Sequence, residues 1–262
     1  MITAEIPVTP SAPTPPVLGR VAWVEEVMGM PVSIHVRAVE PSRPEIARAV
    51  AGVFAHLRRV DSVLSTWRCD SDLLRLQHGE VLETEDLHGW VADVTELCLE
   101  AEERTDGLFA AWRRRGTGRT TFDPTGLVKG WAVAGAAAHL ELVPEVSWSI
   151  GAAGDVVVGT GGGLGPSAPT WRVGIEDPAH AGRVADVVSL RRGAIATSGA
   201  AQRGAHVVDP RTGRGIERDG STTVVGPDLL WADVWATAAW VDPAQAAELM
   251  AERDPAYRLV VL

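Results

Sequence analysis

The feature that most constrains the fold is a long run of regularly spaced apolar residues between residues 42 and 64. Apolar side chains recur at intervals of four and three positions, at Ile46, Val50, Val53, Leu57, Val60 and Leu64. This spacing places them on one face of an amphipathic α-helix. Ser42 followed by Glu45 matches a capping box at the helix start. The sequence therefore predicts a helix that buries one face against other elements.

Strand-like and helix-like segments follow one another in mixed order. We expect strands over 20–27, 32–38, 171–175, 184–190, 194–197, 222–225 and 258–262, with a strand pair over 148–159 interrupted at 151–155. Helices are expected over 85–104, 131–142 and 243–253. The order lacks the regular alternation of a parallel doubly wound sheet. It predicts an α+β fold, with antiparallel sheets and packed helices forming two lobes of one compact unit.

The bulk properties limit the organisation and the partners. Residues 1–19 contain five prolines and are expected to form a flexible tail before one domain over 20–262. The sequence contains no apolar run of 18 residues, so no membrane span is predicted, and the N-terminus does not resemble a signal peptide. Both observations favour a cytoplasmic protein. A net charge of −10 without a basic stripe argues against nucleic acid as a partner. Of the two cysteines, Cys98 falls on an apolar helical stripe and Cys69 does not.

Two oxygen-bearing side chains stand out near the C-terminus. Asp233 and Thr237 are four positions apart at the start of an apolar run, so a helix would present both on one face. Carboxylate and hydroxyl oxygens suit Mg²⁺ or Ca²⁺. The alternative is a helix N-terminus that favours an acid, with the threonine hydroxyl bonded to its own helix. Spacing alone leaves both interpretations open.

The motifs around this pair resemble those of the ApbE-like FAD:protein FMN transferases. A Ser-Gly pair at 198–199, His-x-x-Asp-Pro-Arg-Thr-Gly at 206–213, Thr-Val-Val at 223–225 and Ala-Asp-x-x-Ala-Thr-Ala at 232–238 follow in the family's order. The resemblance extends from about Val21 to Leu262. It implies Mg²⁺-dependent transfer of FMN from FAD to a Ser or Thr hydroxyl of a partner flavoprotein, with release of AMP. An FAD pyrophosphatase and a non-catalytic FAD-binding protein remain alternatives.

The resemblance also implies residues that contact FAD. Met28, in Met-Gly-Met where the family has Met-Gly-Thr, and Trp67, in Leu-Ser-Thr-Trp, correspond to residues facing the flavin; a plain core role for Met28 stays open. Leu108, Phe109 and Ala110 correspond to a segment along the adenosine half. Ala110 stands where an aspartate is usual, so we expect weaker FAD binding than in relatives.

The remaining implied roles concern the phosphates, the metal and the proton. The segment 123–130 matches the family's Asp-x-x-Gly-x-x-Lys-Gly, and a glycine-containing loop that opens a helix presents N–H groups to an anion. The resemblance implies that Asp123 and Lys129 contact the nucleotide and that the Gly126 carbonyl joins Asp233 and Thr237 at the metal. His206 is the candidate for proton transfer, with Asp233 the other catalytic candidate. Val208, in the same motif as His206, is a candidate contact to FAD.

Overall fold

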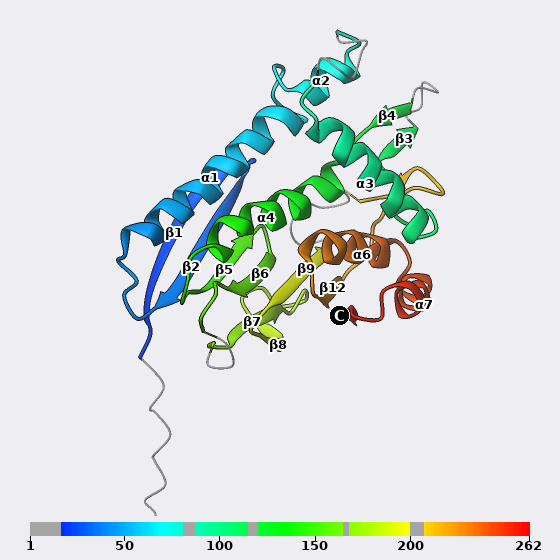
Figure 1. Ribbon diagram of the computed structural model, residues 1–262. Helices are drawn as coiled ribbons and strands as arrows, with labels where there is room; N and C mark the ends of the chain where they lie inside the picture. Colours follow the sequence, from blue (N-terminus) through cyan, green and yellow to red (C-terminus); the bar gives the residue numbers. More distant parts are fainter. Residues whose placement is uncertain (1–16, 81–86, 115–119, 165–167, 200–206) are drawn as a thin grey trace, which may run out of the picture.

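The computed structural model describes residues 17–80, 87–114, 120–164, 168–199 and 207–262. Its main element is a seven-stranded sheet in the order β1-β2-β5-β6-β9-β12-β13, with every neighbouring pair antiparallel (Figure 1). The strands are β1 Gly19–Val27, β2 Met30–Ala38, β5 Ser147–Ala152, β6 Asp155–Thr160, β9 Gly193–Gly199, β12 Ser221–Gly226 and β13 Arg258–Val261.

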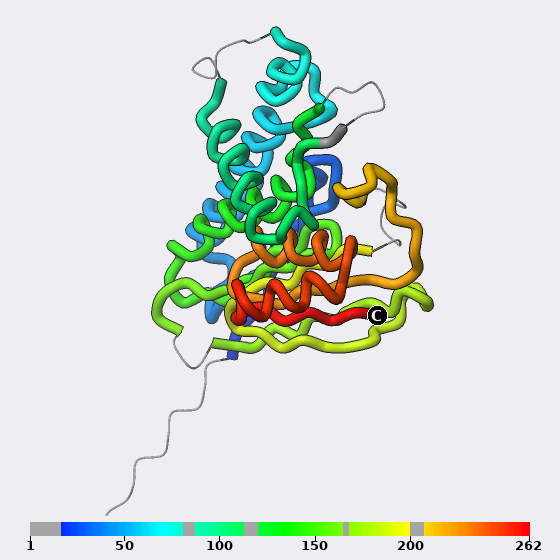
Figure 2. The backbone as a smooth tube through the Cα atoms, turned by 90° about the vertical axis from the view of Figure 1, so that its right-hand side faces the viewer, coloured from blue at the N-terminus to red at the C-terminus, as the bar shows by residue number. Residues whose placement is uncertain are grey.

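Three short hairpins accompany this sheet. They are β3 Trp112–Arg114 with β4 Thr120–Phe122, β7 Trp171–Glu176 with β8 Val184–Leu190, and β10 Val208–Asp209 with β11 Arg214–Gly215. The β7–β8 hairpin packs against the large sheet through a small apolar cluster of Ile175, Val188, Ile195 and Val225. This hairpin lies on the sheet face opposite the helices, as the turned view shows (Figure 2).

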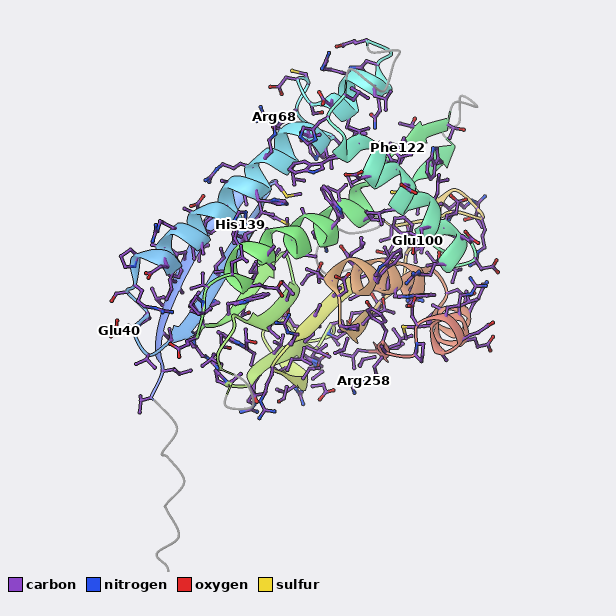
Figure 3. All side chains as sticks on the ribbon, viewed as in Figure 1. Glu40, Arg68, Glu100, Phe122, His139 and Arg258 are labelled. Carbon is purple, nitrogen blue, oxygen red and sulfur yellow. The ribbon has the colours of Figure 1, made fainter. Side chains whose placement is uncertain are left out.

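Helices lie on the other side of the sheet. Three of them, α1 Pro44–Leu64, α4 Thr125–Glu141 and α6 Leu229–Val241, pack on the strands. The others, α2 Asp72–Gln77, α3 Trp90–Arg104 and α7 Pro243–Arg253, pack on these helices. Helix α1 runs along one side of the molecule, from near Glu40 at one end to near Arg68 at the other (Figure 3). Among the described residues, no helix combines the length and the apolarity that crossing a bilayer would require. The predicted α+β class with antiparallel sheets is confirmed.

The apolar face predicted for α1 is the face that the helix buries. Ile46, Val53 and Leu57 are among its fully buried residues, and the face packs into the main core. The predicted capping box is wrong, because the helix begins at Pro44 and the N-cap residue, Arg43, makes no side-chain capping bond. Proline suits the first helical position, where its fixed φ is already helical and its missing N–H is not needed. The start of α1 is therefore set by Pro44 and not by a capping box.

Strand β2 shows the alternation expected of a sheet with one face in the core. Val32, Ile34 and Val36 are fully buried, whereas the side chains between them are only partly covered. The two cysteines also differ in their exposure to solvent. Cys98 is buried in the core, and this burial raises the pKa of its thiol to about 12, whereas Cys69 is exposed.

Candidate active site

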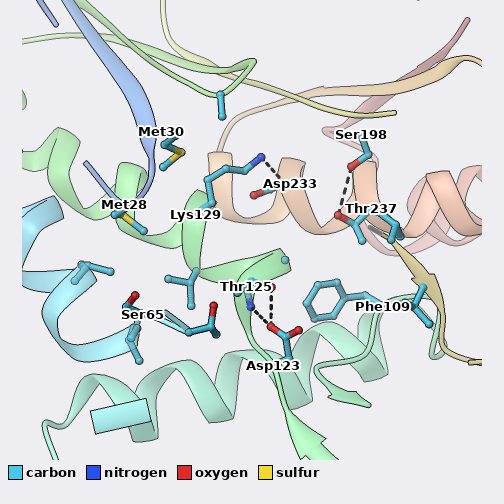
Figure 4. Close-up of a pocket in the computed structure, with 18 of the residues that line it drawn as sticks. Met28, Met30, Ser65, Phe109, Asp123, Thr125, Lys129, Ser198, Asp233 and Thr237 are labelled. Atoms are coloured by element: carbon cyan, nitrogen blue, oxygen red, sulfur yellow. Dashed lines mark hydrogen bonds and ion pairs between the residues drawn. The ribbon is translucent and has the colours of Figure 1, made fainter. Parts of the chain in front are cut away.

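A pocket of about 530 Å³ opens where the end of α1, the start of α4, helix α6 and the end of β9 meet, beside the β5–β6 turn (Figure 4). Its volume lies within the range of small-molecule sites. Every predicted site residue that the structure describes lines this pocket: Met28, Trp67, Leu108, Phe109, Ala110, Asp123, Gly126, Lys129, Val208, Asp233 and Thr237. His206 lies outside the described residues. Segments far apart in the sequence thus meet at one cavity.

The first turn of α4 forms one wall of the pocket. Thr125 begins the helix, and its backbone N–H and its hydroxyl both donate to Asp123 Oδ1, at 3.2 and 2.7 Å. The Phe109 ring lies directly on Gly126, since a Cβ added there would be 3.1 Å from the ring. A larger residue at position 126 would push Phe109 outward. The glycine therefore allows an aromatic ring to lie against the helix N-terminus.

Asp233 lies inside helix α6 and not at its N-terminus. Asp228 caps this helix by accepting a hydrogen bond from the Trp231 backbone N–H, and the helix begins at Leu229. Asp233 follows in the second turn and is only 3% exposed. The interpretation of Asp233 as an acid favoured by a helix end is therefore wrong. Thr237 is one turn further along, with its Oγ1 3.5 Å from Ser198 Oγ.

Lys129 connects Asp233 to a second buried carboxylate. Its Nζ lies 2.6 Å from Asp155 Oδ2 and 3.5 Å from Asp233 Oδ1. Asp155 is the first residue of β6 and is 1% exposed, and its Oδ1 accepts a hydrogen bond from the Thr197 backbone N–H at 3.1 Å. The interruption at 151–155 in the sequence ends in this aspartate, but the pattern does not predict a role for Asp155.

The three charges shift one another's pKa values. Burial raises the pKa of Asp233 and of Asp155, and the Lys129 ammonium partly opposes each shift. Burial alone would lower the pKa of Lys129, but the two carboxylates outweigh it and raise that pKa. Two carboxylates thus face one ammonium. Asp155 Oδ2 and Asp233 Oδ2 are both buried without a hydrogen-bond partner among the described residues, although Asp155 Oδ2 forms the 2.6 Å ion pair with Lys129.

The other predicted contacts divide between the two ends of the pocket. Met28 and Gly29, with φ values of 55° and 69°, form the two-residue turn between β1 and β2. This turn places Met28 at the pocket while part of its side chain packs on the core. Trp67 is 92% exposed. Phe109 lies at the end of the pocket away from Met28 (Figure 4).

Comparison with known proteins places these residues in a family. The ApbE family model matches residues 110–261. The chain belongs to the ApbE family. An FAD:protein FMN transferase of Klebsiella pneumoniae (strain 342) is 26% identical, over 90% of this chain and 83% of that protein. One of Salmonella typhimurium is also 26% identical, over 74% of this chain and 71% of that protein.

Solved structures of ApbE-family proteins share the fold. The ApbE protein of Thermotoga maritima has a TM-score of 0.74 at 18% identity, covering 93% of this chain and 94% of its own. The flavin transferase ApbE of Vibrio cholerae has a TM-score of 0.69 at 18% identity, covering 93% and 97%. At these identities the likeness shows the common architecture alone.

The pocket of this ApbE-family chain offers oxygen ligands for a hard cation. Gly126, Asp233 and Thr237 line one cavity, where they would supply a backbone carbonyl, a carboxylate and a hydroxyl. The described residues contain no cluster of three or more His, Cys, Asp or Glu side chains that could hold a metal. A site with one carboxylate completed by substrate phosphates is typical of Mg²⁺. The donor set therefore fits Mg²⁺ better than Zn²⁺.

Proposed function

We propose that this chain transfers FMN from FAD to a Ser or Thr hydroxyl of a partner flavoprotein and releases AMP, with Mg²⁺ as its metal. The relatives from Klebsiella and Salmonella, which match most of this chain, are named FAD:protein FMN transferases. The observation that carries the proposal is Asp233, which lines the pocket and has one buried carboxylate oxygen, Oδ2, without a hydrogen-bond partner among the described residues.

The residues present fit the metal that this reaction requires. Asp233 and Thr237, with the Gly126 carbonyl, would hold Mg²⁺ through hard oxygen atoms. When bound, the ion would neutralise charge on the pyrophosphate as its P–O bond breaks. Lys129 Nζ lies 3.5 Å from Asp233 Oδ1, so the other carboxylate oxygen, Oδ2, is the one left for the ion.

The chain's own residues orient FAD along the pocket. We place the flavin at the end lined by Met28 and Trp67 and the adenosine at the end lined by Phe109 and Ala110. The N-terminal end of α4, whose helix dipole favours an anion, and the Lys129 ammonium then face the pyrophosphate between them. This arrangement brings the bond to be broken beside Asp233 and Thr237.

The reaction exchanges one P–O bond for another. The acceptor hydroxyl oxygen bonds to the phosphorus of the FMN half, and the bond from that phosphorus to the bridging oxygen breaks. The bridging oxygen leaves with AMP, and the hydroxyl gives up its proton. His206 is our candidate to take that proton, a role worth about 10²- to 10⁴-fold in rate.

The proposal is tested by mixing the protein with FAD, Mg²⁺ and candidate acceptors and measuring flavin fluorescence on the denatured acceptor. We expect fluorescence that requires the acceptor's Ser or Thr and disappears with chelator. Asp233→Asn should abolish FAD cleavage while circular dichroism shows an intact fold. Cleavage to FMN and AMP without labelled protein would show a pyrophosphatase. FAD binding without cleavage, with any acceptor, would show a non-catalytic flavin-binding protein.

A further inference from the structure

The carboxylates of Asp155 and Asp233 do not share Lys129 equally. Lys129 Nζ lies 2.6 Å from Asp155 but 3.5 Å from Asp233, so the short ion pair belongs to Asp155. Oδ2 of each carboxylate is buried without a hydrogen bond among the described residues, but Asp155 Oδ2 is the atom in the 2.6 Å ion pair, whereas Asp233 Oδ2 has no ion-pair partner among them. An ion-pair network that served only stability would be expected to satisfy both carboxylates, because an unpaired buried oxygen costs free energy. The asymmetry leaves available the carboxylate oxygen that the proposed metal would bind.

Asp155 is held rigidly enough to maintain this asymmetry. The β5–β6 hairpin turns through Ala153 and Gly154, whose φ values are 47° and 93°, and Asp155 follows as the first residue of β6. Its Oδ1 accepts a hydrogen bond from the Thr197 backbone of the neighbouring strand β9, at 3.1 Å. Its Oδ2 is then directed at Lys129. One oxygen is fixed by the sheet, and the other fixes the lysine.

Lys129 would otherwise be a competitor for the metal. Its side chain is 23% exposed at the pocket wall, and its ammonium is already within 4 Å of Asp233 Oδ1. An ammonium that moved into full contact with Asp233 would occupy the position of the cation and neutralise its principal ligand. Charge-assisted hydrogen bonds of this kind are about twice as strong as neutral ones. Lys129 must therefore be held at its 3.5 Å distance from Asp233 without moving into closer contact with that carboxylate.

We propose that Asp155 is a positioning residue for the transferase reaction: it engages Lys129 and so keeps the Asp233 carboxylate available to the divalent cation. This inference rests on the proposed function. Asp155 does not line the pocket, in contrast to Lys129 and Asp233, so it acts through the lysine and not on FAD. It also keeps the ammonium beside the place proposed for the pyrophosphate.

The test measures cation binding directly, with Mn²⁺ as an electron paramagnetic resonance probe of Mg²⁺ sites and without FAD. In Asp155→Asn we expect Mn²⁺ affinity to fall about tenfold or more, the order set by one hydrogen bond to a charged group. Asp155→Asn combined with Lys129→Met should recover most of the affinity, because the competing ammonium is gone. Asp155→Glu, which keeps the charge, should stay near the wild type.

Three outcomes would overturn the inference. They are unchanged Mn²⁺ affinity in Asp155→Asn, an equally weak double variant, and a crystal structure of metal-free Asp155→Asn in which Lys129 Nζ is no closer to Asp233. The second would indicate structural damage or direct ligation by Asp155. Failure of the proposed function is distinguishable, because the wild-type protein itself would then bind no Mn²⁺ or transfer no FMN.

Discussion

Gly130 should be the position at which a single added methyl group disturbs both stability and the metal site. It lies where α4 crosses α6, one residue after Lys129. A Cβ at this position would lie 3.0 Å from the Leu229 carbonyl oxygen, 3.1 Å from Leu230 Cα and 3.1 Å from Asp233 Cβ. Two of these atoms are backbone atoms of α6. The helix would therefore have to move by a few tenths of an ångström, and Asp233 would move with it.

The magnitude follows from two opposed effects. Alanine is favoured over glycine inside a helix by about 1 kcal/mol, whereas overpacking a tight contact costs about 1–3 kcal/mol. Gly135→Ala, in the same helix, is the matched control: its Cβ would meet only the His56 side chain, 3.2 Å from Nε2 and 3.5 Å from Cε1, and no backbone atom. We expect the free energy of unfolding of Gly130→Ala to be lower than that of Gly135→Ala by roughly 1–3 kcal/mol.

Urea denaturation of both variants measures this difference, and titration of FAD cleavage with Mg²⁺ measures the effect on the site. Gly130→Ala should need more Mg²⁺ for half-maximal activity, whereas Gly135→Ala should not. The reasoning is refuted if the two variants are equally stable and share the wild-type Mg²⁺ requirement. In that case the α4–α6 contact would not set the position of Asp233.

Three further predictions address other residues. Ala110→Asp should tighten FAD binding by roughly tenfold, the effect of one hydrogen bond to a charged acceptor, and leave FMN affinity unchanged; titrations with both ligands decide this, and weaker FAD binding would contradict it. Asp106, in the preceding turn, is not expected to replace the hydrogen-bond acceptor that Ala110 lacks, since its carboxylate accepts a hydrogen bond from Gln245 at 3.4 Å. His206→Ala should slow cleavage by about 10²-fold with little change in FAD affinity, and a loss explained by FAD binding alone would assign His206 to binding. Burial, and then the charge of His139, lowers the pKa of His56 below 6.5, so the contribution of His56 to stability is present above that pH and is lost as the pH falls through its folded-state pKa. His56→Gln should therefore narrow the difference in melting temperature between pH 7.5 and pH 5.5. An unchanged difference would argue against this role of His56.

Local patterns in the sequence were enough to predict the main elements. The spacing of apolar residues gave the buried face of α1, and the alternation at Val32, Ile34 and Val36 gave the buried face of β2. Each of these buried faces can be read from the side-chain periodicity of a single helix or strand. The apolar run that begins near Asp233 does not mark the start of α6, because the residue that caps the helix is Asp228, five positions earlier.

The candidate site was predicted in its membership but not in its internal contacts. Motif resemblance named residues that the fold brings to one pocket, including Asp233 and Thr237. It did not reveal that Lys129 pairs with Asp155. That contact depends on the packing of α4 over the sheet and on the hairpin turn that sets the first residue of β6. No local repeat in the sequence encodes either relation.

The contrast between the two cysteines makes the unmodified chain suitable for site-selective labelling. Cys98 is enclosed in the core and its thiol has a pKa of about 12, so alkylating reagents that attack thiolates will not reach or activate it in the folded protein. Cys69 is exposed and follows Trp67, a residue of the pocket rim, by two positions. A maleimide dye would therefore attach at one place beside the pocket. Its emission could report the arrival of FAD or of the acceptor protein in real time, without a cysteine having to be added or removed.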